Sequence, residues 1–239
     1  MILGVYGYQD SGKTQMIEGL IAELKRKRYR VASIKHTSLK MSIDFEGKDT
    51  WRHWKAGSDP VALSTETETS IIKHSRISLG DLAEMISRDF RPDVILVEGG
   101  KEGSFPKIAI GDLAPRQGTV MVNPGVKKAV AYIENEVAVE RTLRKLPGLD
   151  CHKCGADCGG LARAIVAGKR KLGDCKELPN VGVAVSVGGK PLAMGKFASS
   201  IVDQTVRGML GSLKGYEDGK DVEIRLVAKK AATRTRRRA

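Results

Sequence analysis

Residues 7–14 read GYQDSGKT and match the phosphate-binding pattern G-x-x-x-x-G-K-[ST] at every fixed position. An apolar run over residues 2–6 precedes the motif and predicts a buried strand. Apolar side chains at helical spacing follow the motif over residues 15–27 and predict a helix. In this context loop N–H groups and the positive end of the helix point at phosphate oxygens. The sequence therefore predicts a nucleotide-binding protein.

The residue types of this loop suggest individual roles. Lys13 is expected to reach the β- and γ-phosphates and to assist catalysis, and the Thr14 hydroxyl is expected to bind Mg²⁺. The rest of the nucleotide-binding loop is expected to surround the phosphates with Gly7, Gln9, Asp10, Ser11 and Gly12.

The composition is that of a soluble globular protein. The chain has 239 residues, of which 41% are hydrophobic and 29% are charged, which is enough for one full core and a smaller unit. No apolar run approaches the roughly 20 residues that span a bilayer. No basic and then apolar leader precedes the first predicted strand. We therefore expect a cytoplasmic protein without a membrane contact.

The net charge of +13 is unevenly distributed along the chain. Residues 229–239 hold six of these charges and few apolar side chains, which is typical of a disordered, solvated tail. The remaining +7 suits an anionic ligand. A weak, salt-sensitive contact of the tail with nucleic acid is the alternative, but we do not expect nucleic acid to be the main partner.

Alternating strand and helix patterns predict an α/β fold of the phosphate-loop NTPase class, with a mainly parallel sheet and helices on both faces. Helices are expected over residues 79–89 and 135–146, and a short helix is possible over 49–56. The expected strands after the first cover residues 30–34, 60–64, 69–73, 93–98, 106–110, 119–122 and 129–133.

The strand over residues 93–98 carries an acidic residue at each end. Ligands of open α/β sheets bind outside the carboxyl ends of the strands. Glu98 lies at that end and Asp93 at the other, so Glu98 is the expected Mg²⁺-side and catalytic carboxylate. Gly99 follows it and would give the backbone room near the γ-phosphate.

A long polar stretch over residues 37–57 follows the second predicted strand. Its position after the first helix is where phosphate-loop folds place a mobile switch loop. The residues alone leave a switch loop and a plain surface excursion equally open.

All four cysteines fall within residues 151–175, with the spacing C-x2-C-x3-C-x16-C. Four thiolates in a piece too small for its own core suggest a metal-stapled module. Disulfides are not expected in a reducing cytosol. Three clustered cysteines and a distant one favour a [4Fe–4S] cluster, with Zn²⁺ as the alternative. The expected ligands are Cys151, Cys154, Cys158 and Cys175.

Four regions are therefore expected. Residues 1–147 form the phosphate-loop domain, and residues 148–178 form the cysteine module. Residues 179–228 read as a small β-β-α-β docking domain with its last strand over 221–227, and residues 229–239 are the basic tail.

Several ordered stretches of residues 1–147 resemble the MobB family, phosphate-loop GTP-binding adapters of molybdopterin-guanine dinucleotide biosynthesis. They are the loop GYQDSGKT, the Lys35-His36 step, GKDTWRHWKAG from residue 47, VEGGK from residue 97 and FPKIAI from residue 105. Residues 151–175 separately resemble the cysteine modules of some [4Fe–4S] proteins, although those commonly have one more residue between the second and third cysteines.

The MobB resemblance implies a dimer that binds GTP with Mg²⁺, hydrolyses it slowly and assists a MobA-type guanylyltransferase acting on molybdopterin. It implies that Glu98 and Lys101 lie at the γ-phosphate edge. It also makes function probable for the polar stretch and implies that the following residues lie near nucleotide or cofactor: His36, Asp44, Lys48, Asp49, Arg52 and His53.

The function expected on this basis is a GTP-binding adapter, with weak GTPase activity, in molybdenum or tungsten cofactor biosynthesis. The alternative is an iron–sulfur protein whose nucleotide domain serves metal-centre assembly, redox chemistry or sensing. The chain has no N-K-x-D guanine-reading motif, so the preference for GTP over ATP rests on the resemblance alone.

Overall fold

The computed structural model describes residues 1–180, 182–188 and 190–224, and the chain divides into two compact units. Unit 1 comprises residues 1–145 and 162–170, and unit 2 comprises residues 146–161 and the chain from residue 171 onward. Among the described residues, none of the helices is both long enough and apolar enough to cross a membrane.

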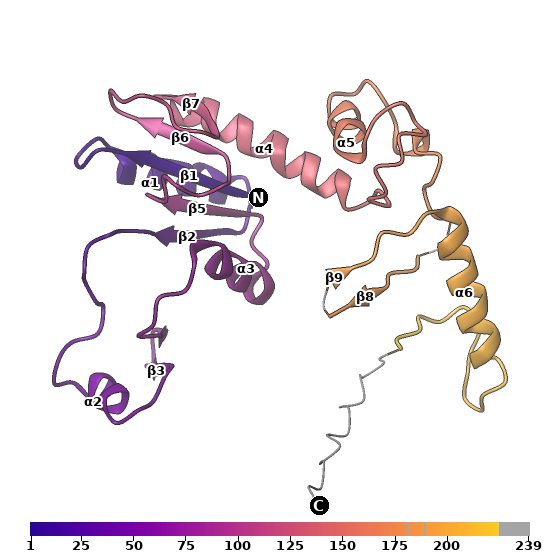
Figure 1. Cartoon of the computed structure of the whole chain (residues 1–239), viewed down its shortest axis with the longest axis horizontal. Coiled ribbons are helices and arrows are strands. Elements are labelled where there is room, and N and C mark those ends of the chain that lie inside the picture. Colours follow the sequence, from indigo (N-terminus) through magenta and orange to yellow (C-terminus); the bar gives the residue numbers. More distant parts are fainter. Residues whose placement is uncertain (181, 189, 225–239) are drawn as a thin grey trace, which may run out of the picture. The chain divides into compact units, whose positions relative to one another are not determined.

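Unit 1 is built on a five-stranded parallel sheet in the order β2-β5-β1-β6-β7, which Figure 1 shows as one stack. The strands are β1 (Ile2–Gly7), β2 (Val31–Lys35), β5 (Val94–Glu98), β6 (Lys107–Ile110) and β7 (Thr119–Val122). The central strands are buried on both faces, which explains their continuous apolar sequences.

Helices cover both faces of this sheet. Alternate residues of β5 point to opposite sides, so Leu96 packs in the core under α1 (Lys13–Arg26) and α4 (Val126–Leu143). Val97 packs in the core on the other face under α3 (Leu79–Phe90). The predicted fold class, a mainly parallel sheet with helices on both faces, is therefore confirmed.

One predicted strand is wrong. Residues 129–133 belong to α4, which begins at Val126 and is longer than the helix expected over 135–146. The buried positions Ala129, Ile133 and Val137 are four residues apart. That spacing fits a helix, and a short apolar window over 129–133 does not reveal it.

Between β2 and α3 the chain leaves the sheet over residues 36–78, a stretch that we call the excursion. It contains α2 (Asp49–Lys55) and an antiparallel hairpin of β3 (Val61–Ser64) and β4 (Thr69–Ile72). Figure 1 shows the chain leaving the end of β2, passing through α2 and β3, and returning to α3.

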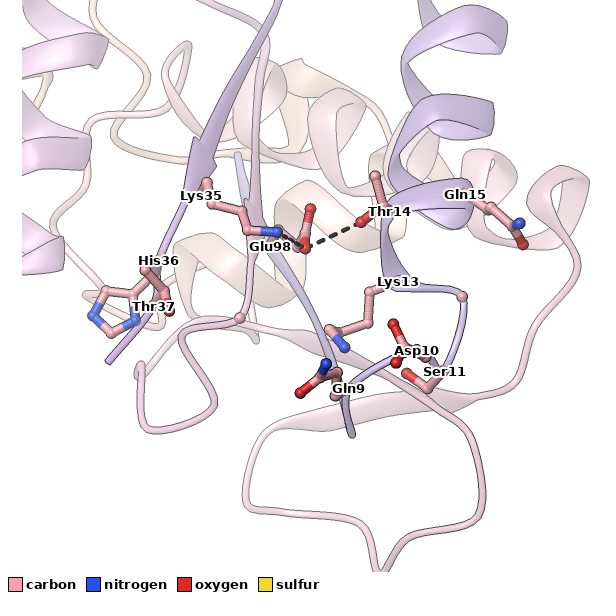
Figure 2. Close-up of a pocket in the computed structure, with 12 residues that line it drawn as sticks. Gln9, Asp10, Ser11, Lys13, Thr14, Gln15, Lys35, His36, Thr37 and Glu98 are labelled. Carbon is pink, nitrogen blue, oxygen red and sulfur yellow. Dashed lines mark hydrogen bonds and ion pairs between the residues drawn. The ribbon is translucent and has the colours of Figure 1, made fainter. Parts of the chain in front are cut away.

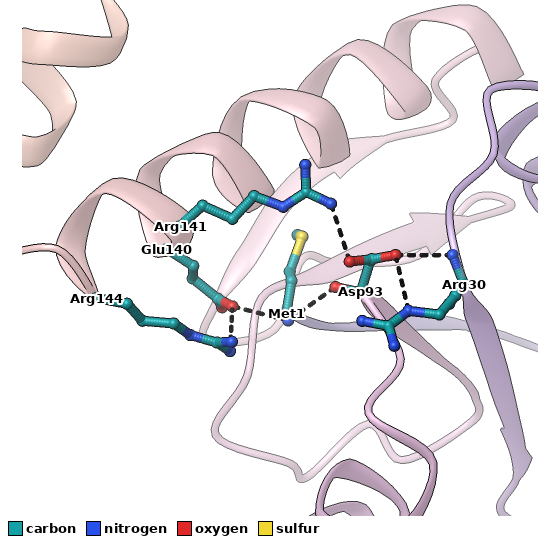
Figure 3. A network of polar contacts seen from close by, with 6 residues as sticks. All are labelled: Met1, Arg30, Asp93, Glu140, Arg141 and Arg144. Atoms are coloured by element: carbon teal, nitrogen blue, oxygen red, sulfur yellow. Dashed lines mark hydrogen bonds and ion pairs between the residues drawn. The ribbon is translucent and has the colours of Figure 1, made fainter. Parts of the chain in front are cut away.

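A network of charged groups lies at the amino ends of the strands, as Figure 3 shows. Asp93 accepts hydrogen bonds from the Arg30 backbone N–H at 2.8 Å and from the Arg141 guanidinium at 2.9 Å. The Met1 amine donates to Glu140 at 2.9 Å. This network ties β1, the start of β5 and α4 together on the side of the sheet that faces away from the phosphate loop.

Unit 2 contains the four cysteines, a hairpin and a helix. Its elements are the first part of α5 (Cys158–Val166), the 3₁₀ turn η1 (Leu172–Asp174), β8 (Ser186–Val187), β9 (Lys190–Pro191) and α6 (Lys196–Leu210). Each strand of the hairpin has two residues, and residues 221–224, the described part of the predicted last strand, are not a strand. The rest of the predicted last strand and the basic tail over 229–239 lie outside the described residues.

Candidate functional site

A cavity of about 660 Å³ opens at the carboxyl ends of β1, β2 and β5. Three segments line it, namely residues 9–15, 35–37 and 98–99. Figure 2 shows their side chains converging from the phosphate loop, the end of β2 and the end of β5. The cavity thus lies where open α/β sheets bind their ligands.

The phosphate loop depends on glycine at two positions. Gly12 has a φ of +88°, the left-handed region, directly before α1 begins at Lys13. A Cβ atom on Gly7 would lie 2.3 Å from the Ile110 carbonyl oxygen and 2.5 Å from Ser11 Oγ. The Lys13 ammonium donates to the Tyr8 carbonyl oxygen, so its positive charge lies over the loop where phosphate oxygens would bind.

Glu98 joins the two sides of the cavity. Its Oε1 atom accepts a hydrogen bond from the Thr14 hydroxyl at 3.2 Å and lies 2.5 Å from Lys35 Nζ. Only 12% of the Glu98 side chain is exposed. A hydroxyl and a carboxylate side by side are the oxygen donors that Mg²⁺ takes, so Thr14 and Glu98 fit the predicted metal-side role.

Sequence reasoning did not single out Lys35 as a site residue. The strands β2 and β5 pair in parallel with Lys35 opposite Glu98, which brings both side chains to the same edge of the sheet. The position of Lys35 at the end of a predicted strand was a usable signal.

His36 and Gly99 also meet at the cavity. The His36 backbone N–H donates to the Glu98 carbonyl oxygen at 2.9 Å. Gly99 has a φ of +88°, and a Cβ atom there would lie 2.4 Å from the His36 carbonyl oxygen. The close passage of the two chains therefore requires a glycine at this position.

Beyond His36, the structure does not bring the predicted residues of the excursion to this cavity. Asp44 is buried inside the excursion, where its Oδ2 atom lies 3.2 Å from His74 Nε2 and its Oδ1 atom accepts from Thr50 at 2.7 Å. The Trp54 ring stacks on His74 with centroids 4.0 Å apart. None of these side chains lines the cavity. The same holds for the other predicted residues of the excursion, which are Lys48, Asp49, Arg52 and His53.

Lys101 also lies outside the nucleotide cavity. It lines a second cavity together with Gly7 and Tyr8.

None of the four cysteines of unit 2, all of which lie within the described residues, is in a disulfide. Burial raises the pKa of the Cys175 thiol; the backbone N–H of Glu177 opposes this, and the charges of the other three cysteines raise the pKa further. Within the described residues, however, no three Cys, His, Asp or Glu side chains are placed to hold a metal ion. The donor set fits an iron–sulfur cluster by its chemistry, and binding would require the sulfurs to move closer together.

Comparison with known protein families gives two matches. Residues 2–133 match the family of molybdopterin guanine dinucleotide synthesis protein B, MobB. Residues 146–177, which include all four cysteines, match a family described as "Putative Fe-S cluster". An iron–sulfur domain is therefore indicated in this part of the chain.

The chain is 30% identical over 235 residues to the "Putative molybdopterin-guanine dinucleotide biosynthesis adapter protein" of Methanocaldococcus jannaschii. This alignment covers 94% of this chain and 97% of the relative. The molybdopterin-guanine dinucleotide biosynthesis adapter protein of Haemophilus influenzae is 37% identical over 146 residues, covering 59% of this chain and 79% of the relative. The crystal structure of Bacillus subtilis MobB is 22% identical in sequence and superposes with a TM-score of 0.45. The superposition covers 56% of this chain and 96% of the MobB chain. This chain belongs to the MobB family.

Proposed function

We propose that this chain is a GTP-binding adapter in the formation of molybdopterin guanine dinucleotide. The observation that carries the proposal is the juxtaposition of the Lys13 ammonium, the Thr14 hydroxyl and the Glu98 carboxylate at one edge of the sheet. The names of the relatives from M. jannaschii and H. influenzae support the pathway. The partner would be the guanylyltransferase that attaches GMP to molybdopterin, and the chain would act as a homodimer.

The cavity suits a nucleoside triphosphate with Mg²⁺. Loop N–H groups and Lys13 would hold the phosphate oxygens, while Thr14 and Glu98 would hold the metal ion, which screens charge on the β- and γ-phosphates. Lys35 neutralises Glu98 from the side of β2. Catalysis by these residues would be mainly charge stabilisation at the γ-phosphate, which fits a slow GTPase.

The decisive test is an equilibrium titration with non-hydrolysable GTP and ATP analogues in Mg²⁺, on anaerobically prepared protein. We expect a clear preference for GTP, and loss of binding in Lys13→Ala. Lys25→Ala, which removes an exposed charge from the last turn of the same helix, is the matched control and should bind normally. A preference for ATP, or unchanged affinity in Lys13→Ala, would contradict the proposal.

The second part of the proposal is a [4Fe–4S] cluster held by Cys151, Cys154, Cys158 and Cys175. Four cysteines in one unit, none of them in a disulfide and all within the stretch that matches an iron–sulfur family, support it. Protein purified anaerobically should then show broad brown absorbance that is lost in Cys154→Ser. Colourless protein with stoichiometric zinc would contradict this part and leave the nucleotide proposal intact.

A further inference from the structure

A second cavity, of about 350 Å³, lies next to the phosphate loop and does not share lining residues with the nucleotide cavity. Tyr6, Gly7 and Tyr8 form one part of its wall, and residues 113–116 with Lys101 form the rest. Its volume is in the range of small-molecule sites, roughly 300–1,000 Å³. The segment from Tyr6 to Tyr8 leads directly into Gln9, which lines the nucleotide cavity, so consecutive residues of one segment line the two cavities.

The floor of this second cavity is fixed by hydrogen bonds. The buried Tyr6 hydroxyl accepts from the Arg116 backbone N–H at 2.8 Å and lies 2.7 Å from Thr119 Oγ1. Because the Thr119 hydroxyl donates its own hydrogen to the Arg116 carbonyl at 2.6 Å, Tyr6 must donate to Thr119. The loop over residues 111–118 is thereby held in place above the end of β1.

Two cations line this cavity. Lys101 is exposed, and within the described residues it has no carboxylate at ion-pair distance. The Arg116 guanidinium lies 2.5 Å from Glu102, whose side chain is 77% exposed. Exposed ion pairs of this kind contribute little free energy, so a phosphate can compete for the guanidinium fork.

The rest of the wall is apolar and aromatic. Tyr8 belongs to the phosphate-binding motif, and it is 69% exposed. The run Leu113-Ala114-Pro115 adds an apolar surface without a charge. An exposed ring beside a small apolar surface suits stacking of a planar, unsaturated molecule.

We infer that this second cavity binds a small planar heteroaromatic molecule that carries a phosphate group, with its ring on Tyr8 and its phosphate at Lys101 and Arg116. The inference rests on the proposed function for the identity of the ligand, because a phosphorylated pterin is the molecule of this class on which that pathway acts. Bound here, it would lie against residues 6–8 of the phosphate-loop segment, directly before the residues that line the nucleotide cavity.

The probe is 6-hydroxymethylpterin monophosphate, with unphosphorylated 6-hydroxymethylpterin as its comparison, and binding is followed by pterin fluorescence with the full chain. We expect the phosphorylated probe to bind about tenfold more tightly, since charge-assisted hydrogen bonds hold its phosphate. Arg116→Ala and Lys101→Ala should each remove about that factor. Lys128→Ala removes an exposed charge from α4, away from the cavity, and should leave binding unchanged.

Titration of the same preparations with the GTP analogue separates this inference from the proposed function. Arg116→Ala should retain GTP affinity, and Lys13→Ala should retain affinity for the pterin phosphate. Equal affinity for the two pterins would overturn the inference, as would equal losses in Arg116→Ala and Lys128→Ala. Displacement of the pterin phosphate by the GTP analogue, together with its loss in Lys13→Ala, would assign it to the phosphate loop and also overturn the inference. Failure of GTP binding alone would count only against the proposed function.

Discussion

The Thr14 hydroxyl donates a hydrogen bond to Glu98 Oε1 at 3.2 Å, across 84 positions of sequence. The two residues reach each other because β1 and β5 are parallel neighbours whose carboxyl ends meet at one edge of the sheet. Thr14 ends the phosphate-binding motif and Glu98 ends the adjacent strand, so the pairing of the strands brings the two residues together.

Thr14→Ala and Glu98→Gln should each weaken GTP binding in Mg²⁺ by about 10- to 100-fold. Each substitution removes an oxygen atom that would bind the metal ion or hold its partner in the contact between Thr14 and Glu98. Titration with a GTP analogue measures the loss. The internal control is the same titration in EDTA, where variant and wild type should differ little. An equal loss in EDTA would show that these residues act without the metal.

Gly7→Ala should lower the free energy of unfolding by about 1–3 kcal/mol and abolish nucleotide binding, because the new methyl group would overlap the Ile110 carbonyl and Ser11 Oγ. Chemical denaturation gives the first quantity and the GTP titration the second. Gly80→Ala is the matched control, since a Cβ atom there would lie 3.7 Å from Ser78 Oγ, within a helix. It should be neutral or slightly stabilising.

Asp44→Asn should leave GTP affinity unchanged, because Asp44 contacts His74 and Thr50 inside the excursion and does not line the nucleotide cavity. His74→Ala removes the ring that stacks on Trp54 and should change the tryptophan fluorescence and speed proteolysis within residues 36–78. Glu46→Gln, at an exposed neighbouring position, is the control. Loss of GTP affinity in Asp44→Asn with the excursion intact would restore the direct nucleotide contact expected from the sequence.

Asp93 should make stability depend on pH in the acid range. Burial raises the pKa of Asp93, but the Arg30 N–H and the Arg141 guanidinium outweigh burial and hold it below the ordinary 3.8. A lowered pKa in the folded state means that the unfolded chain takes up the proton first, so the stabilisation is complete above 3.8 and is lost as the pH falls through the folded-state value.

Asp93→Asn should therefore be less stable than wild type at neutral pH, and the difference should shrink below about pH 4. Urea denaturation at a series of pH values measures it. Asp112→Asn, which replaces an exposed carboxylate outside the network of Figure 3, should show no such pH-dependent difference. A constant gap between Asp93→Asn and wild type across this range would contradict the assignment.

The sequence allowed the phosphate loop, the sheet class and the position of Glu98 to be predicted because each depends on local pattern and strand direction. The contacts within the excursion could not be predicted, since the pairing of Asp44 with His74 spans a helix and a hairpin and follows no periodicity. The helix over residues 126–143 was misjudged in its first half because Ala129 to Ile133 is short and apolar enough to fit either a strand or a helix.

The strands β2 and β5 pair directly, with Lys35 opposite Glu98. In the sequence between these two residues, the chain leaves the sheet over residues 36–78. The entropic cost of a longer loop grows only with the logarithm of its length. Insertions and deletions within residues 36–78 are therefore compatible with the same sheet. The part of this segment beyond Thr37 can therefore change in length while the phosphate loop and its carboxylate keep their places.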